Sequence, residues 1–461
     1  MNARFTKFWQ DLQSSYYFIP GLMGLGSIFL AYLTIHLDKV YGLEVSEFGF
    51  FLSNKADGAR TILATIAGSM MGVAATTFSI TMVAVTSAAG QYGPRLIGNF
   101  MRDRGNQITL GTFTSTFIYC LLILRVARTG DADGVENAVT EFVPNISLLT
   151  AMGLTITSVG VLIFFIHHVP ETLNVGNITA RVGRRLRKDI EALYPENLGQ
   201  QDKDKDIDLS EYQTNDAIEI YAKAEGYIQT VNESALMNTA SKDDAVIKIE
   251  YRPGDFVTAG DTLVRIWSDK DWTSGDYQTY RNAFAMGQDR TAHQNILFLA
   301  DELVEILARA LSPGVNDPFT AINCINWFHS AMKVFMKGNM PSPYRRDDDG
   351  NLRVIAYPID FMRFASVICD QSRAYVASDR NTTLKMMAVL TELAAQTENK
   401  DAKAILMAHL EKLRDAALEA QSSSPDADDI KVRYNHAQEL IDDIEFYKEE
   451  VTSQRWIGGR G

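Results

Sequence analysis

The residues of this chain most suggestive of chemistry lie along one apolar segment. Between residues 61 and 90, positions three or four apart fall on one face of a helix. That face carries seven candidates, all of them glycine or hydroxyl-bearing except Val83: Thr65, Ser69, Gly72, Thr76, Ser79, Val83 and Thr86. Hydroxyl oxygens can replace part of the hydration shell of an ion, and small residues allow two helices to approach closely. The stripe is therefore a candidate either for lining a water-filled path or for packing against another helix.

Charge begins directly after this segment, where Gly90, Gly93 and Pro94 are expected to end the helix. The short connection that follows carries four charged residues: Arg95, Arg102, Asp103 and Arg104. One interpretation is ordinary anchoring by positive charge on the inner side of a membrane. The other is an electrostatic constriction at an inner mouth, where Asp103 neutralises one of the arginines.

The elements that would position these residues are four uncharged stretches near the N-terminus, at 12–37, 61–94, 108–124 and 142–170. About 20 mostly apolar residues are needed for a helix to cross a bilayer. Residues 1–170 are therefore predicted to form a transmembrane domain. Its four helices are expected at about 16–37, 61–90, 107–127 and 142–168.

The distribution of Lys and Arg predicts the orientation of these helices. If the N-terminus is inside, basic residues are about twice as frequent at the inner ends as at the outer ends. No cleavable signal peptide is evident, so the first helix is expected to be retained. The sequence thus predicts a multipass protein of a bacterial inner (cytoplasmic) membrane, with both termini in the cytoplasm.

The remaining chain is polar, and we expect it to form a cytoplasmic α+β part. Residues 171–210 are predicted to be an amphipathic connecting helix and linker, whose basic face either lies against the anionic inner leaflet or is solvated. Residues 211–275 show short alternating runs typical of strands, and 276–461 show helical spacing. The fold class is therefore a four-helix membrane domain followed by a small β barrel-like module and a helical domain.

Within the β module, Gly254 and Gly260 each precede an aspartate and are expected to form turns. The pattern "GYIQTV…VIKIEYRPGDFVTAGDTLVRIW" resembles the biotinyl- and lipoyl-type barrel-sandwich hybrid over residues 217–267. Such carriers need a lysine at a hairpin tip, and no lysine here has that setting. No covalent cofactor is therefore expected, and none is predicted elsewhere.

No enzyme is predicted. The sequence lacks Gly-x-Ser-x-Gly, Walker and His-Glu-x-x-His motifs. Its three cysteines form no Cys-x-x-Cys pair, and the histidines lack metal-ligand spacing, so no metal site is expected. The net charge of −13 argues against a nucleic-acid partner. Ser312, Asn316 and Asp317 are candidates for a cytoplasmic polar pocket, although a helix end, a turn and a cap explain them without a function.

Two phrases together resemble a known family. They are "FSITMVAVTSAAGQYGPRLIGNFMRDRGNQITLGTF" and "GQDRTAHQNILFLADELVEILARALSPGVNDPFTAINCI". They are similar to the bacterial predicted membrane proteins called domain of unknown function 2254, over roughly residues 10–440. The resemblance implies a multipass inner-membrane protein with a soluble C-terminal half. It implies no reaction and no functional residue.

Two functions follow from the sequence. The first is a homo-oligomeric channel or permeation protein, in which the second helix lines the path and the cytoplasmic part assembles or gates it. Four helices of one copy enclose little room, so this function needs a symmetric oligomer. Its partners would be the lipid bilayer, further copies of itself and small ions. The alternative is a membrane-anchored sensor or scaffold that binds a ligand or partner through its cytoplasmic domains.

Overall fold

The computed structural model describes residues 16–46, 56–93, 103–128, 142–194, 217–422 and 425–453. Its internal contacts divide the chain into two compact units. One spans Gln10–Asn177 and the other contains Ile178–Gly461.

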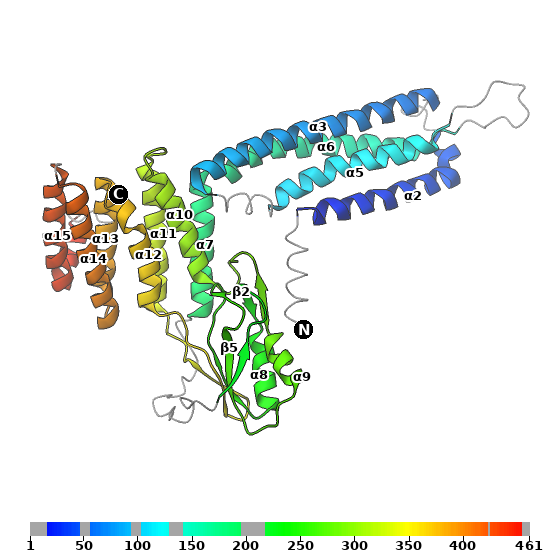
Figure 1. The fold of residues 1–461 in the computed structure, drawn as a ribbon. Helices are drawn as coiled ribbons and strands as arrows, with labels where there is room; N and C mark the ends of the chain where they lie inside the picture. The colour runs from blue at the N-terminus through cyan, green and yellow to red at the C-terminus, as the bar shows by residue number, and fades with distance from the viewer. Residues whose placement is uncertain are drawn as a thin grey trace, which may run out of the picture. The chain divides into compact units, whose positions relative to one another are not determined.

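The first unit is a bundle of long helices that run side by side (Figure 1). They are α2 (Phe18–Ser46), α3 (Ala56–Tyr92), α5 (Arg104–Val126) and α6 (Asn145–Leu173). All four are long and apolar enough to cross a membrane. At about 1.5 Å per residue, each exceeds the roughly 30 Å of a bilayer core. The predicted fold class, with four transmembrane helices before an α+β part, is confirmed.

Helix α5 is the central element of this bundle because it packs against α2, α3 and α6. Tyr119 and Ile123 of α5 are fully buried with Leu63 of α3 and Leu148 of α6. A Cβ atom at Gly111 would lie 2.4 Å from the sulfur of Met23, so the close approach of α2 and α5 requires glycine there. The outer faces of α2 and α6 expose large apolar side chains, as expected of surfaces that contact lipid: Leu22, Leu25, Phe29, Ile156, Ile163 and Ile166.

Helix α7 (Val175–Leu193) occupies the region predicted as a connecting helix. Its apolar face, including Val182 and Leu186, is buried. A Cβ atom at Gly183 would lie 2.2 Å from the ring of Trp327, which belongs to α11 (Pro318–Lys337). From Ile178 onward α7 is therefore a packed part of the C-terminal unit. Residues 195–210 of the predicted linker lie outside the described residues.

The β module consists of two small sheets. Its strands are β1 (Ile218–Tyr221), β2 (Gly226–Val231), β3 (Val246–Ile249), β4 (Phe256–Val257), β5 (Thr262–Trp267), β6 (Phe284–Gly287), β7 (Tyr344–Arg346) and β8 (Leu352–Ile355). One sheet has the order β1-β5-β3-β8-β7 and the other β4-β2-β6. Every pairing is antiparallel except that of β3 with β8.

Two turns of this module follow the prediction. Gly254 and Gly260 both have φ of +100°, a conformation that side chains other than glycine rarely adopt. In each turn the following aspartate accepts a hydrogen bond from the backbone N–H three residues earlier. The distances are 2.9 Å for Asp255 with Arg252 and 2.8 Å for Asp261 with Thr258. The two Gly-Asp pairs therefore form turns of the same type.

The extent of the module differs from the predicted residues 211–275. Strand β6 completes the smaller sheet, and β8 pairs in parallel with β3 through Ile247 and Val354. Both strands come from the region predicted to be helical. The strands within 217–267 are thus not a closed unit, and the resemblance to a biotinyl- or lipoyl-type barrel finds no support.

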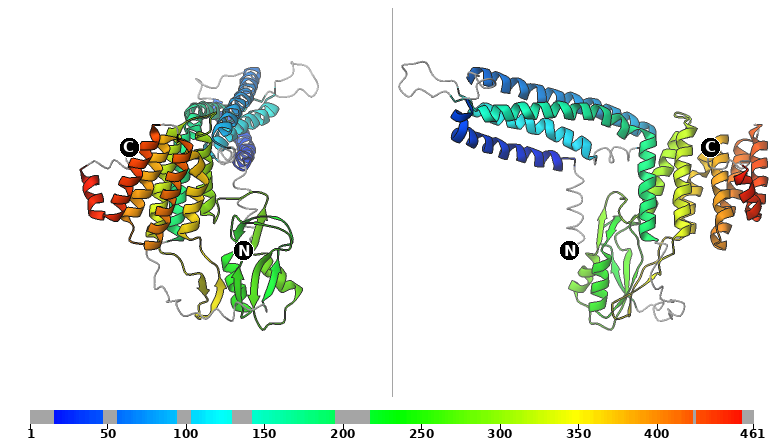
Figure 2. Two further views of the ribbon diagram at one scale, coloured as in Figure 1. Left: turned by 60° about the vertical axis from the view of Figure 1, so that its left-hand side comes forward. Right: turned by 180° about the vertical axis from the view of Figure 1, so that it is seen from behind.

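The rest of the C-terminal unit is helical, with successive helices packed beside one another (Figures 1 and 2). Helices α8 (Glu233–Lys242) and α9 (Ser274–Arg281) accompany the sheets. The helical part contains α11 together with α10 (Ile296–Ala310), α12 (Phe361–Val376), α13 (Arg380–Gln396), α14 (Lys400–Ala420), α15 (Asp426–Asp442) and α16 (Ile444–Thr452).

Candidate functional site

The polar stripe of α3 lies on the face turned away from the bundle. All seven predicted candidates, Thr65, Ser69, Gly72, Thr76, Ser79, Val83 and Thr86, are exposed in the single chain. The packed face of α3 is a different one: Leu63, Ala67, Met70, Ala74, Thr81, Val85 and Ala89. A helix-packing role for the stripe therefore requires a helix other than the described helices of this bundle.

The glycines on this outer face are not required by packing within the chain. A Cβ atom built at Gly68 or Gly72 would meet no other atom within 4 Å. In contrast, Gly105 and Gly111 of α5 lie directly against side chains of neighbouring helices. Small residues four apart are typical of close contact between two membrane helices. Gly68 and Gly72 are therefore open to contact with a helix other than those that the structure describes in the bundle.

The hydroxyl groups of the stripe behave in two ways. Thr65 donates a hydrogen bond of 2.8 Å to the carbonyl of Thr61 in its own helix. Four others have no hydrogen bond to any residue that the structure describes: Ser69, Thr76, Ser79 and Thr86. A hydroxyl group exposed to hydrocarbon without a partner costs a few kcal/mol. Water or a neighbouring subunit would remove that cost.

Asp103, an inner-mouth candidate just before α5, has two hydrogen-bonding roles. Its carboxylate caps α5 by accepting from the N–H of Asn106 at 3.1 Å, and it lies 2.7 Å from Nε2 of His168 on α6. A Cβ atom at Gly105 would lie 2.5 Å from the same nitrogen, so this contact depends on glycine. In one of the two interpretations of this region Asp103 neutralises an arginine; among the described residues its side-chain partner is His168.

Of the other inner-mouth candidates, the structure describes one. Arg104 begins α5 and is exposed. Arg95 and Arg102 lie outside the described residues. His168 also stacks on Phe164, with 4.9 Å between ring centroids. Among the described residues, the Asp103–His168 pair joins the start of α5 to the end of α6. A constriction at an inner mouth stays a prediction.

A buried carboxylate that no sequence motif indicated is Asp38 of α2, which is 4% exposed. Its oxygens accept hydrogen bonds from the N–H of Ile146 at 2.7 Å, the N–H of Ser147 at 3.0 Å and the hydroxyl of Ser147 at 2.5 Å. The N-cap of α6 is Pro144, which has no side chain able to do this. Asp38 thus satisfies the first donors of α6 from another helix.

A second buried contact extends this network into α5. The hydroxyl of Tyr119 lies 2.8 Å from that of Thr34 on α2 and donates to the carbonyl of Ser147 at 3.1 Å. Two sequence signals were available: a carboxylate one residue beyond the apolar stretch 12–37, and a helix that begins at Pro144-Asn145 without a good cap.

The cytoplasmic candidates Ser312, Asn316 and Asp317 form a turn and a cap. Ser312 donates to the carbonyl of Arg309 at 2.6 Å, and Asn316 has φ of +50°. Asp317 accepts from the N–H of Thr320 at 3.1 Å, with Pro318 in the first turn of α11, as predicted. These contacts account for the local geometry of all three residues.

A cavity of about 500 Å³ lies elsewhere in the C-terminal unit, between the end of α7 and the β module. Tyr194, Tyr251 and Tyr357 supply aromatic rings to its lining, and Arg252 and Arg345 supply positive charge. Tyr194 donates to the carbonyl of Ile359 at 2.9 Å, and burial raises its pKa to about 12. The phenol is therefore a neutral group in a cavity whose described lining carries two arginines and one carboxylate, Glu233.

Within the described parts of the chain, no group of three or more His, Cys, Asp or Glu residues could hold a metal ion. The three cysteines are free and buried. Burial raises the pKa of the Cys369 thiol to about 12. A reactive thiolate at that position is therefore disfavoured.

Comparisons with known proteins agree with this architecture. The family described as "Predicted membrane protein (DUF2254)" matches residues 13–392. "Uncharacterized protein Mb1321c" of Mycobacterium bovis and "Uncharacterized protein Rv1290c" of Mycobacterium tuberculosis are each 29% identical over 346 residues. These alignments cover 74% of this chain and 64% of each relative, so the chain spans a little under two thirds of their length. No solved structure matches the chain. With four apolar helices and a family match over most of its length, the chain belongs to the predicted membrane protein family DUF2254.

Proposed function

We propose that this membrane protein forms a symmetric homo-oligomer in which α3 of every copy lines a path for small ions. The supporting observation is the contrast between outer faces. Those of α2 and α6 expose leucine, isoleucine and phenylalanine, whereas α3 exposes a line of glycine and hydroxyl residues that only Val83 interrupts among the seven candidates. Met71 and Ile80 are exposed beside that line. They would mark the transition from the path to lipid.

Closed rotational symmetry brings the same helix of each subunit to one axis. Close contact through Gly68 and Gly72 would bury the glycine surface between neighbouring copies. The hydroxyls of Thr76 and Ser79 would then face water along the axis, where they could bind ions that have lost part of their hydration shell. The C-terminal unit would hold the copies in register or gate the path.

A cross-linking experiment tests the oligomer. Cysteine replaces Thr76 on the outer face of α3, and the native cysteines are buried. A short bifunctional thiol reagent applied to membranes should yield dimers and higher species on a denaturing gel. The matched control is Ile163→Cys on the outer face of α6, which should remain monomeric. Efficient cross-linking of the control with none at residue 76 would contradict an α3 interface.

The proposal includes an orientation, with both termini and the C-terminal unit in the cytoplasm of a bacterial inner membrane. The asymmetry of Lys and Arg supports it. A cysteine at Gly134, in the predicted outer loop, should react with an impermeant thiol reagent added outside intact cells. A cysteine at the exposed Asp349 should react only after the cells are opened. The reverse labelling pattern would overturn the topology.

The second candidate is a membrane-anchored sensor, and the cavity beside Tyr194 favours it. Its two arginines and three tyrosines would suit a small anionic aromatic ligand. A purified monomer, or a two-fold dimer whose α3 interface is dry, would favour this function over the channel.

A further inference from the structure

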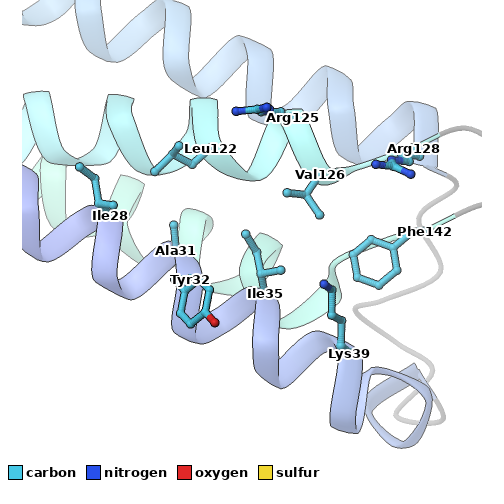
Figure 3. Close-up of a pocket in the computed structure, with 10 residues that line it drawn as sticks. All are labelled: Ile28, Ala31, Tyr32, Ile35, Lys39, Leu122, Arg125, Val126, Arg128 and Phe142. Carbon is cyan, nitrogen blue, oxygen red and sulfur yellow. The ribbon is translucent and has the colours of Figure 1, made fainter.

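A groove of about 630 Å³ lies between α2 and α5, at the end of the bundle where α6 begins (Figure 3). It involves neither the stripe of α3 nor the C-terminal unit. Its lining divides into two chemically different parts, one apolar and one basic.

The apolar part follows the two helices along the bundle. Ile28 and Ile35 of α2 point toward Leu122 and Val126 of α5 across the groove. Tyr32 contributes a ring that is 74% exposed. Side chains of this kind, at the depth of a transmembrane helix, suit a hydrocarbon chain.

The basic part lies at the end of the groove. Lys39 comes from the last turns of α2, Arg125 from the last turn of α5, and Arg128 from the segment just beyond α5. Arg128 is held there by a two-way backbone pairing with Phe142, at 3.2 and 3.1 Å. The ring of Phe142 also lines the groove, beside Lys39 (Figure 3).

Among the residues that the structure describes, no carboxylate lines this groove, and none of the three cations forms an ion pair there. The carboxylate of Asp38, next to Lys39 in sequence, is occupied by three hydrogen bonds from the start of α6. The groove thus presents net positive charge at one end and an apolar surface along the rest.

We propose that this groove binds an anionic phospholipid, with its phosphate between Lys39, Arg125 and Arg128 and an acyl chain along Ile28, Ile35 and Val126. The occupant is inferred from charge complementarity and from position. The basic residues lie at helix ends, at the level of lipid headgroups, and the apolar wall extends from there toward the middle of the bilayer. A soluble anion would use the basic end and leave the apolar wall exposed.

The test compares lipids bound to the full-length protein, measured by native mass spectrometry after reconstitution in nanodiscs. Phosphatidylglycerol and phosphatidylcholine with identical acyl chains are supplied in equal amounts. Wild-type protein should retain phosphatidylglycerol preferentially. Each cation near a lipid surface contributes about fivefold to such binding. The Lys39→Gln, Arg125→Gln, Arg128→Gln triple variant should therefore lose about a hundredfold in preference.

The matched control removes three exposed charges elsewhere: Lys223→Gln, Lys242→Gln and Lys400→Gln. It should keep the wild-type preference. Val126→Trp fills the apolar wall while all three cations remain, and it should also reduce lipid retention. An unchanged gel-filtration profile shows that each variant is folded.

Three results would overturn the proposal. The first is equal retention of both lipids by wild-type protein, which needs no variant at all. The second is an equal loss in the triple variant and its control. The third is displacement of phosphatidylglycerol by equimolar glycerol phosphate, which would reveal a site for soluble phosphate. Since none of these measurements uses ion flux, their outcome is independent of the channel proposal.

Discussion

Replacing Ser79 by leucine is expected to abolish ion flux through reconstituted protein while leaving the oligomer intact. Ser79 lies on the outer face of α3, and the structure describes no partner for its hydroxyl. The uncharged stretch 61–94 places it far from any charge on its own helix. An ion passing this depth would rely on hydroxyl and backbone oxygens to replace its water.

Leucine at this position would remove an oxygen and narrow the path with an apolar side chain. Each copy would lose a polar partner worth about 1–3 kcal/mol, which corresponds to about fivefold to a hundredfold in flux. Because every copy in the oligomer carries the substitution, the losses combine and flux should fall below detection. Flux is measured in liposomes, and oligomer size is measured on the same preparation. Thr157→Leu on α6 is the matched control, because Thr157 is an exposed hydroxyl residue on a face with large apolar neighbours. The control should conduct normally.

The two results together separate the possible roles of the stripe. If Ser79→Leu dissociates the oligomer, the stripe is a packing face, because an extra side chain would overfill a close helix contact. If the variant conducts like the wild type and remains assembled, α3 does not line the path. Liposomes of wild-type protein that exclude small ions at every voltage tested would count against the channel and in favour of the sensor.

Much of the fold could be predicted because its signals are local. The uncharged stretches define α2, α3, α5 and α6, since a bilayer imposes length and hydropathy on each crossing separately. The turns at Gly254 and Gly260 also depend on a few adjacent residues, as does the Asp317 cap. Each of these features can be predicted from neighbouring residues, without knowing how the rest of the chain folds.

The features that escaped prediction depend on contacts between distant residues. Strand β8 joins β3 across about a hundred residues, and nothing near Val354 specifies Ile247 as its partner. The amphipathic sequence of α7 is compatible with a linker helix, with a helix on the membrane surface and with a helix packed in a domain. The contact of Gly183 with Trp327, a residue far away in the sequence, shows that α7 is packed.

For the candidate site, the sequence shows which residues form the α3 stripe but not what those residues contact. Small hydroxyl residues suit a helix contact and a water-filled path equally. The structure narrows the question because the chain's own helices occupy the opposite face, around Leu63 and Ala67. No local pattern in the sequence specifies what contacts the stripe.

The second large effect is expected from Asp38→Ala, which should destabilise the membrane unit. Alanine would leave the N–H groups of Ile146 and Ser147, and the Ser147 hydroxyl, without their acceptor. Water could not readily replace it, because Asp38 is 4% exposed and Ser147 is fully buried. Leaving buried donors unsatisfied costs about 1–3 kcal/mol each, although relaxation of the first turn of α6 would recover part of this. We therefore expect a net loss of about 2–4 kcal/mol.

The measurement is the temperature at which half of the protein leaves the monodisperse gel-filtration peak in detergent. The Asp38→Ala midpoint should fall by about 5–10 °C. Asp38→Asn keeps one acceptor oxygen and should fall between alanine and wild type. The matched control is Asp57→Ala, which removes an exposed carboxylate from the first turn of α3 and should change the midpoint little. Equal midpoints for Asp38→Ala and Asp57→Ala would mean that the cap from α2 contributes nothing to the bundle. The start of α6 would then be held by Tyr119 and the apolar contacts of Leu148 alone.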